Sequence, residues 1–287
     1  MSPSANDQKI QDEKFLEYIY THLNKQLIPS ANPEYENMVL GRPYNPVDPE
    51  LVVKRCLVND YLTYFNNEIT LSGIMKDHAA NEPNSSTELS LAKDPEFPGL
   101  EDMVATITDL QKASKFPQLL QDKRSRFLNK YVLGKMGRNC FFEPPVFFDY
   151  GFNTIVGDNF YCNFNCVFLD CSLIEIGDNV MLGPGVNLLT ATHPLSSAER
   201  NFKGIELSYP IYIGDQCWLG SNVVVCPGVR LGKRCVVAAG AVVTKSFDDG
   251  CLLAGVPAKV IRVIDESEDI DEFVRQQKQE LDRLQNI

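Results

Sequence analysis

The chain has 287 residues, of which 44% are hydrophobic and 23% charged, and its formal net charge is −11 at pH 7. This composition is that of an ordinary globular protein, and the negative charge argues against nucleic acid or an acidic membrane surface as the main partner. No apolar run approaches the ~20 residues that span a bilayer, and the N-terminus lacks a signal-peptide pattern. None of the nine cysteines forms a CxxC pair. We therefore expect a cytoplasmic protein with reduced thiols.

The first expected unit, residues 1–32, is an amphipathic helical extension. Its apolar residues follow helical spacing: Leu16, Ile19, Tyr20, Leu23 and Leu27. A second, helical unit is expected over residues 33–137, interrupted by an insertion at about 68–122. The part DHAANEPNSSTELSLAKDPEFPG is rich in polar, Pro and Gly residues and predicts a loop, whereas LEDMVATITDLQKA, residues 100–113, predicts a short helix.

A six-residue repeat dominates residues 138–264. Its first place is aliphatic in nine hexapeptides, which form two runs spaced by six residues: Ile176, Leu182 and Leu188, then Ile213, Leu219, Val225, Leu231, Val237 and Val243. Such a period fits neither a helix nor long alternating strands. It predicts a solenoid of very short strands, a parallel β-helix, and nine matches argue against the alternative of a β-sandwich with regular turns. Residues 265–287 predict an acidic C-terminal helix.

Several cysteines fall on the same repeat, among them Cys162, Cys217 and Cys235. A nucleophilic or metal-binding role is the alternative, but a buried free cysteine packs as a small hydrophobe. We therefore expect these thiols to stack inside the solenoid.

His193 ends the hexapeptide LLTATH, and residues 194–209 must leave the solenoid before the repeat resumes. An imidazole can remove a proton near pH 7, although a solvated or structurally bonded histidine is the simpler alternative. The other two histidines, His22 and His78, lie far upstream. A zinc site of several histidines, as in γ-class carbonic anhydrases, is therefore excluded within one chain, and we expect no metal.

The segment 219–262 is basic within an acidic chain. It holds six cations against two acidic residues: Arg230, Lys233, Arg234, Lys245, Lys259 and Arg262, with Asp248 and Asp249. A solubilising surface is one explanation. The other is a site for an anionic, phosphate-bearing ligand.

The repeat, together with EPPVFFDYGFN, GDNFYCNFNCVFLD, TATHPL, VVTK and AGVPAKVIR, resembles the hexapeptide-repeat sugar O-acetyltransferases, most of all the maltose O-acetyltransferases with their galactoside and nodulation relatives. The segment EYENMVLGRPYNPVDPELVVKR is similar to their N-terminal helical module. The resemblance implies a left-handed β-helix, acetyl-CoA as cosubstrate, a sugar acceptor, and a homotrimer with active sites between subunits.

By the same resemblance, His193 is the general base. Coenzyme-binding positions are Ser221, Ala239, Thr244, Lys245, Lys259 and Arg262. Acceptor-binding positions are Arg55, Asp149, Asn163, Asp170 and Trp218. Galactoside-type members run Asp-Asp where this chain has Asp170-Cys171, which favours the maltose-like branch. They also place Asp where this chain has Pro46, so Asn45 or Asp48 is a candidate substitute.

The expected reaction is acetyl transfer from acetyl-CoA to a sugar hydroxyl, the 6-hydroxyl of a glucosyl sugar or maltose. Two alternatives stay open. One is a non-catalytic β-helix scaffold, and the other is an acetyltransferase with a non-sugar acceptor such as an amine or a serine hydroxyl.

Overall fold

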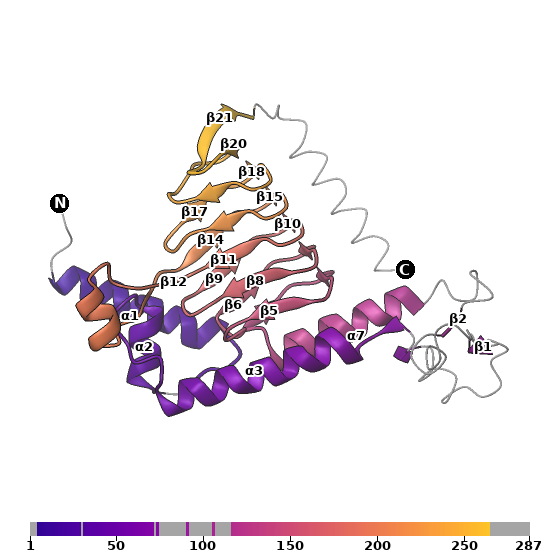
Figure 1. Ribbon diagram of the computed structural model, residues 1–287, viewed down its shortest axis with the longest axis horizontal. Helices are drawn as coiled ribbons and strands as arrows, with labels where there is room; N and C mark the ends of the chain where they lie inside the picture. Colours follow the sequence, from indigo (N-terminus) through magenta and orange to yellow (C-terminus); the bar gives the residue numbers. More distant parts are fainter. Residues whose placement is uncertain are drawn as a thin grey trace.

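The computed structural model describes residues 5–29, 31–71, 73–74, 90–91, 105–106 and 116–264. A stack of short parallel strands rises from a base of helices (Figure 1). The C-terminal helix expected at residues 265–287 and most of the expected insertion lie outside the described residues.

The N-terminal helices begin where the sequence offers capping groups. Helix α1 (Ala5–His22) confirms the predicted N-terminal helix, which ends before Leu23. Asn32 caps α2 (Pro33–Val39) by accepting hydrogen bonds from two backbone amides, and Asp48 caps α3 (Pro49–Glu68) in the same way. In both helices a proline at the first position already has a helical φ.

Two short strands lie within the expected insertion. Strand β1 (Ser90–Leu91) pairs antiparallel with β2 (Ala105–Thr106). The short helix predicted over residues 100–113 is therefore wrong at Ala105–Thr106, where cross-strand pairing overrides a weak helical pattern. Helix α7 (Phe116–Tyr131) begins inside the range predicted for the insertion, and Pro117 in its first turn favours that start.

The strands form three faces, each named here by its first strand. The β3 face consists of β3 (Lys135–Met136), β6 (Thr154–Val156), β9 (Ile174–Ile176), β14 (Ile211–Ile213) and β17 (Arg230–Leu231). The β4 face consists of β4 (Phe141–Phe142), β7 (Tyr161–Cys162), β10 (Met181–Leu182), β15 (Trp218–Leu219), β18 (Val236–Val237), β20 (Cys251–Ala254) and β21 (Lys259–Val263). The β5 face consists of β5 (Val146–Phe148), β8 (Cys166–Leu169), β11 (Asn187–Leu189), β16 (Val224–Val225) and β19 (Val242–Val243).

Pairing between neighbouring turns is parallel throughout these three faces, apart from the antiparallel return of β21 onto β20. The predicted parallel β-helix is confirmed. The repeat's first-place side chains point inward and are at most 2% exposed, and Cys162, Cys217 and Cys235 are fully buried among them. All nine thiols are free; seven of them are buried, Cys226 is partly exposed and Cys56 is exposed.

The Gly-Asp-Asn motif builds the corner between the β3 and β4 faces. Asn159 and Asn179 have positive φ, and the side-chain amide of Asn159 donates to that of Asn179 one turn away at 3.1 Å. At Gly177 a Cβ would lie 2.2 Å from an Asp215 carboxylate oxygen, so only glycine admits the neighbouring turn. The motif therefore recurs because this corner needs a residue with positive φ and a glycine beside the next turn.

The corner that leaves the β5 face departs from the six-residue period. Phe148, Phe168 and Leu188 stack on one another, but eight residues separate Phe168 from Ile176 and twenty-five separate Leu188 from Ile213. We call residues 149–153, 170–173 and 190–210 the extended corner. Later turns return to six residues, as between Val225 and Leu231.

Candidate active site

The extended corner gathers three of the predicted site residues. Asp149 directly follows β5, Asp170 directly follows β8, and His193 directly follows β12 (Ala191–Thr192). Because parallel turns stack in register, these positions lie on the same corner of successive turns. This corner has more residues than the six-residue period requires, and they make room for the side chains of Asp149, Asp170 and His193.

His193 is exposed, and its ring orientation is set by the loop that follows it. Its Nδ1 lies 3.2 Å from the carbonyl oxygen of Ile205. A carbonyl only accepts, so this contact makes Nδ1 the protonated nitrogen and leaves the lone pair of Nε2 available. The loop is closed at its base by β12 and β13 (Leu207–Ser208), which pair antiparallel. The geometry is that of a proton acceptor.

Arg55 reaches the extended corner from α3. Its guanidinium donates to the Tyr150 hydroxyl at 2.9 Å and to the Pro46 carbonyl at 3.0 Å. Beside it, the Asp149 carboxylate accepts a hydrogen bond from the Cys171 thiol at 3.3 Å. Burial raises the pKa of Asp149, while the Cys171 hydrogen bond and the charge of Arg55 act in the opposite direction. Tyr150 is fully buried, whereas Arg55 and Asp149 are partly exposed. A partly exposed guanidinium and carboxylate side by side can bind hydroxyl groups.

Asp170 is fully buried and belongs to the structure of the corner. One carboxylate oxygen accepts from the Tyr150 amide at 2.8 Å, and the other accepts from the Thr154 hydroxyl at 3.0 Å. Burial raises its pKa to about 7, against hydrogen bonds that favour the ionised form. As placed here, Asp170 has no exposed atom to offer a substrate and holds the backbone beside Asp149.

The opposite edge of the β5 face carries a second set of predicted residues. We call residues 163–165, 183–186, 220–223 and 238–241 the glycine corner. Ser221 and Ala239 occupy equivalent places on it, and in the described part of the chain neither amide N–H has an acceptor. A Cβ at Gly220 would lie 2.7 Å from the Ala239 amide nitrogen, so glycine lets these turns approach closely. The corner offers outward backbone donors.

The remaining predicted residues are more dispersed. Asn163 lies on the glycine corner, where its side-chain oxygen accepts from the Phe164 amide at 2.9 Å. Trp218 is half exposed on the β4 face, in register with Met181 and Val236. The other cationic and hydroxyl positions lie at the end of β19 and on β21: Thr244, Lys245, Lys259 and Arg262.

His193 and Ser221 do not meet within one chain. They lie at opposite edges of the β5 face, about five residues of extended chain apart, which corresponds to about 16 Å. The fold brings together Arg55, Asp149 and the His193 corner on one side and the backbone donors on the other.

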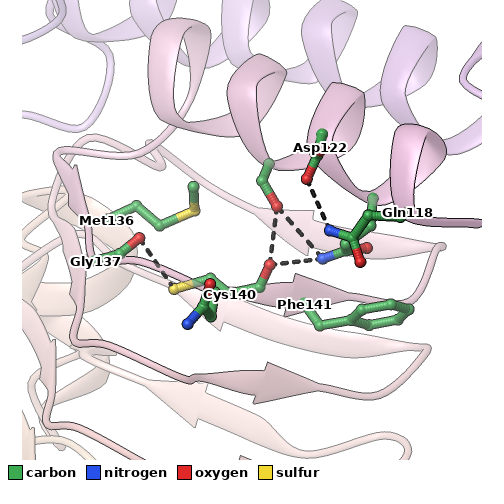
Figure 2. A pocket seen from close by; sticks show the side chains of 9 residues that line it. Gln118, Asp122, Met136, Gly137, Cys140 and Phe141 are labelled. Atoms are coloured by element: carbon green, nitrogen blue, oxygen red, sulfur yellow. Dashed lines mark hydrogen bonds between the residues drawn. The ribbon is translucent and has the colours of Figure 1, made fainter. Parts of the chain in front are cut away.

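A cavity of about 350 Å³ lies elsewhere, between α7 and the first turn (Figure 2). It is lined by Gln121 and Ser125 of the helix and by Cys140 of the turn, and none of the predicted residues lines it. The Cys140 thiol donates to the Gly157 carbonyl at 3.2 Å, and burial raises its pKa to about 11. Cys140 is therefore a protonated packing group and not a nucleophile.

Within the described ranges, no three His, Cys, Asp or Glu side chains are arranged to hold a metal ion. No helix among those residues is both long and apolar enough to cross a membrane.

Sequence reasoning missed two residues that contact the predicted site residues: Tyr150, which bonds to Arg55, and Cys171, which bonds to Asp149. Tyr150 appeared only as a neighbour of Asp149 in FDYG, and Cys171 only as a lost carboxylate. Their contacts join α3 to two turns of the extended corner, across 95 residues for Arg55 and Tyr150. No local pattern signals a pairing over that separation.

The repeat region matches the family described as hexapeptide repeat of succinyl-transferase over residues 210–245. A Schizosaccharomyces pombe protein whose name assigns it as an acetyltransferase is 38% identical over 232 residues, covering 81% of this chain and 92% of the relative. The galactoside O-acetyltransferase of Escherichia coli K12 is 42% identical over 145 residues, covering 50% of this chain and 70% of the relative.

Two solved structures resemble most of this chain. The maltose O-acetyltransferase of Clostridium difficile 630 superposes with a TM-score of 0.62 at 32% identity, covering 83% of this chain and 100% of that one. A galactoside acetyltransferase in complex with coenzyme A gives a TM-score of 0.60 at 29% identity, covering 83% and 94%.

Proposed function

The chain belongs to the hexapeptide-repeat acetyltransferases, and from that premise we propose that it transfers the acetyl group of acetyl-CoA to a sugar hydroxyl. The acceptor of this proposal is the 6-hydroxyl of a glucosyl sugar or maltose. The observation that carries it is the placement of His193, with Nδ1 held and Nε2 free, on the same corner as Arg55 and Asp149.

His193 acts as the general base. Its Nε2 takes the proton of the sugar hydroxyl while the hydroxyl oxygen attacks the thioester carbonyl carbon. The new C–O bond forms as the carbonyl oxygen becomes an oxyanion. When the C–S bond breaks, the protonated His193 returns its proton to the coenzyme sulfur, so that ester and free thiol are the products.

The Ser221 amide is the donor for the oxyanion. A backbone N–H fixed at a tight corner needs no reorganisation when negative charge develops, which makes such donors effective. The coenzyme is held by the Ala239 amide one turn away and by three cations, Lys245, Lys259 and Arg262. Their positive charge complements the coenzyme's phosphates.

Arg55 and Asp149 bind the sugar. Guanidinium donates and carboxylate accepts, so together they satisfy both functions of a hydroxyl group. The Tyr150 hydroxyl and the Pro46 carbonyl fix the guanidinium, and the Cys171 thiol fixes the carboxylate. The pair is preorganised for a polar, hydroxylated acceptor.

The site is assembled between copies of the chain, because His193 and Ser221 lie at opposite edges of the β5 face. Two faces have suitable outward surfaces. On the β4 face the outward row is Phe141, Tyr161, Met181, Trp218, Val236 and Leu252. On the β5 face it is Phe147, Val167, Asn187, Val224 and Val242.

The β3 face differs, because its outward row includes Lys135, Glu175 and Arg230, and Tyr18 of α1 lies against Glu175. Two different apolar faces per chain suit a heterologous contact, which closes into a ring. We propose that this ring is a homotrimer.

Mixing two inactive variants tests both the chemistry and the assembly. The variants are His193→Ala and Ser221→Pro, which removes the amide N–H. Pro184 occupies the equivalent place one turn earlier, so the backbone accepts proline there. Sugar acetylation is measured by mass spectrometry of the product, first for each variant alone and then after co-expression in equal amounts.

If one copy supplies His193 and its neighbour supplies Ser221, about one quarter of the sites in randomly mixed rings are intact and activity returns. A site within one chain predicts no recovery, since no chain then carries both groups. Wild-type protein that acetylates none of a panel of maltose, glucosides and galactosides would refute the proposed function itself.

A further inference from the structure

The loop that carries His193 is anchored by the N-terminal helical module as well as by the solenoid. Its stem is the pair β12–β13, with Ala191 opposite Ser208. The end of α2 and the residues after it run along the outer side of β13. The Tyr44 amide donates to the Glu206 carbonyl at 3.3 Å, which adds a third antiparallel segment to the stem.

Buried hydroxyl groups fasten this junction. The Ser208 hydroxyl donates to the Met38 carbonyl at the end of α2. The Ser172 hydroxyl, on the extended corner, donates to the neighbouring Val39 carbonyl at 3.0 Å. Both serines are fully buried, so each bond is formed away from water and its loss costs free energy. The Met38 carbonyl also accepts from the Gly41 amide at 3.3 Å, so the same carbonyl joins the Ser208 hydroxyl to residue 41.

Gly41 allows the two segments to touch. Its φ is +70°, and a Cβ there would lie 2.9 Å from both the Ser208 carbonyl oxygen and a ring carbon of Tyr209. A backbone oxygen cannot swing aside as a flexible side chain does. Any residue larger than glycine at position 41 therefore displaces β13 from the α2 end.

The junction continues directly to the imidazole. Tyr44 bonds to the carbonyl of Glu206, and the preceding residue, Ile205, supplies the carbonyl that holds His193 Nδ1. Within the same loop, Arg200 donates to the carbonyl of Pro194, the residue after His193, at 3.0 Å. A shift of residues 205–208 therefore moves the Ile205 carbonyl away from Nδ1 of His193. Without that acceptor, the imidazole loses its preference for the Nδ1–H tautomer.

We propose that residues 40–44 form a clamp on the His193 loop, in which Gly41, Tyr44 and Ser208 are positioning residues for the base. The inference rests on the proposed role of His193. It assigns the helical module a task besides acceptor binding: it holds the imidazole so that Nε2 carries the lone pair. The tautomer of a catalytic histidine is worth a large factor in rate, since the wrong one presents a proton where a base is needed.

The tautomer can be read directly. Protein labelled with ¹⁵N-histidine gives two-bond ¹H–¹⁵N spectra in which the Nδ1–H and Nε2–H forms are distinct, and His193→Gln identifies the His193 signals among three histidines. In the wild type we expect the Nδ1–H form. In Gly41→Ala we expect a mixture, with kcat for sugar acetylation at least about tenfold lower and KM for acetyl-CoA unchanged.

Gly204→Ala is the matched control. Gly204 lies in the same loop with φ +64°, but a Cβ there meets nothing within 4 Å, so it carries the same backbone cost without the clash. It should keep the wild-type tautomer and kcat. Ser208→Ala, which only removes the bond to Met38, provides a milder second break should Gly41→Ala not fold, and the same shift in smaller degree is expected.

An Nδ1–H tautomer retained in both Gly41→Ala and Ser208→Ala, with kcat equal to that of Gly204→Ala, overturns the clamp. A wild type inactive on every sugar instead refutes the proposed function, and the tautomer measurement still decides whether the clamp sets the ring.

Discussion

The two edges of the β5 face offer different chemistry from one repeating backbone. At the extended corner the groups of the proposed mechanism are side chains: His193 on its loop, Asp149, and Arg55 reaching in from α3. At the glycine corner they are the backbone amides of Ser221 and Ala239. Additional residues make room for side chains, whereas a tight corner with glycine fixes bare amides. In the proposed mechanism, the inserted loop therefore supplies the general base, and the regular repeat supplies the backbone hydrogen-bond donors.

Removing the side chain at the extended corner should have the largest effect. We expect His193→Ala to lower kcat by roughly 10²–10⁴-fold, the loss typical of a general base. The side chain is exposed and makes one hydrogen bond, so the thermal midpoint should stay unchanged. Acetylation assays and calorimetry on the same preparation check this, and near-wild-type turnover in the variant would remove His193 from the mechanism.

At the glycine corner, by contrast, the side chain should be dispensable and the amide essential. Ser221→Pro should lower kcat by roughly 10²–10³-fold, as for loss of one oxyanion donor. Ser221→Ala keeps the N–H and should act as the wild type does. Equal rates for the proline and alanine variants would exclude the amide as a donor, and a large loss in the alanine variant would instead assign the role to the hydroxyl.

The extended corner holds two carboxyl groups: Asp149, which we propose binds the sugar, and Asp170, which holds the backbone. Burial raises the pKa of Asp170 to about 7, so the native protein keeps a proton that the unfolded chain releases above about pH 4. Between these values the native state binds more protons, and this contribution to the free energy of unfolding falls as pH rises.

We therefore expect the free energy of unfolding of the wild type to fall between pH 5 and 8, relative to Asp170→Asn, by on the order of 2 kcal/mol. The amide imitates the protonated carboxyl and can still bond to Tyr150 and Thr154. Urea unfolding of both proteins at several pH values measures the difference. Parallel pH profiles would show that Asp170 is ionised in the native state.

The smallest effect should come from the cations beyond the glycine corner. Lys245→Glu and Arg262→Glu are expected to raise KM for acetyl-CoA roughly tenfold each, the cost of losing a charged hydrogen bond, with less change in KM for the sugar. Both side chains are exposed, so the fold should not respond. Lys14→Glu, a charge reversal at an exposed position of α1, is the control. An equal effect on the KM of both substrates would assign Lys245 and Arg262 to structure.

Local sequence patterns were sufficient to predict the repeating part of the fold. The aliphatic first places predicted the stacked turns, and buried thiols at Cys217 and Cys235 followed from the same spacing, because each turn contacts the next at a nearly fixed sequence offset. The departure at His193 was visible as a break in that spacing. The strand at Ala105–Thr106 was missed because the sequence around its pairing partner, β1, is rich in polar, Pro and Gly residues and has no strand pattern.

Tertiary structure decided what does not repeat. The sequence by itself determined a β-helix with one histidine on an outward loop. It did not determine that Asp170 is buried while Asp149 lies within the electrostatic field of Arg55. Nor did it determine that Gly41 and Tyr44 contact the base of the His193 loop. These contacts join α2 and α3 to turns more than ninety residues away, and their positions depend on how whole elements pack. Periodicity describes neighbours along the solenoid; the docking of the helical module onto it depends on complementary surfaces that exist only after both have folded.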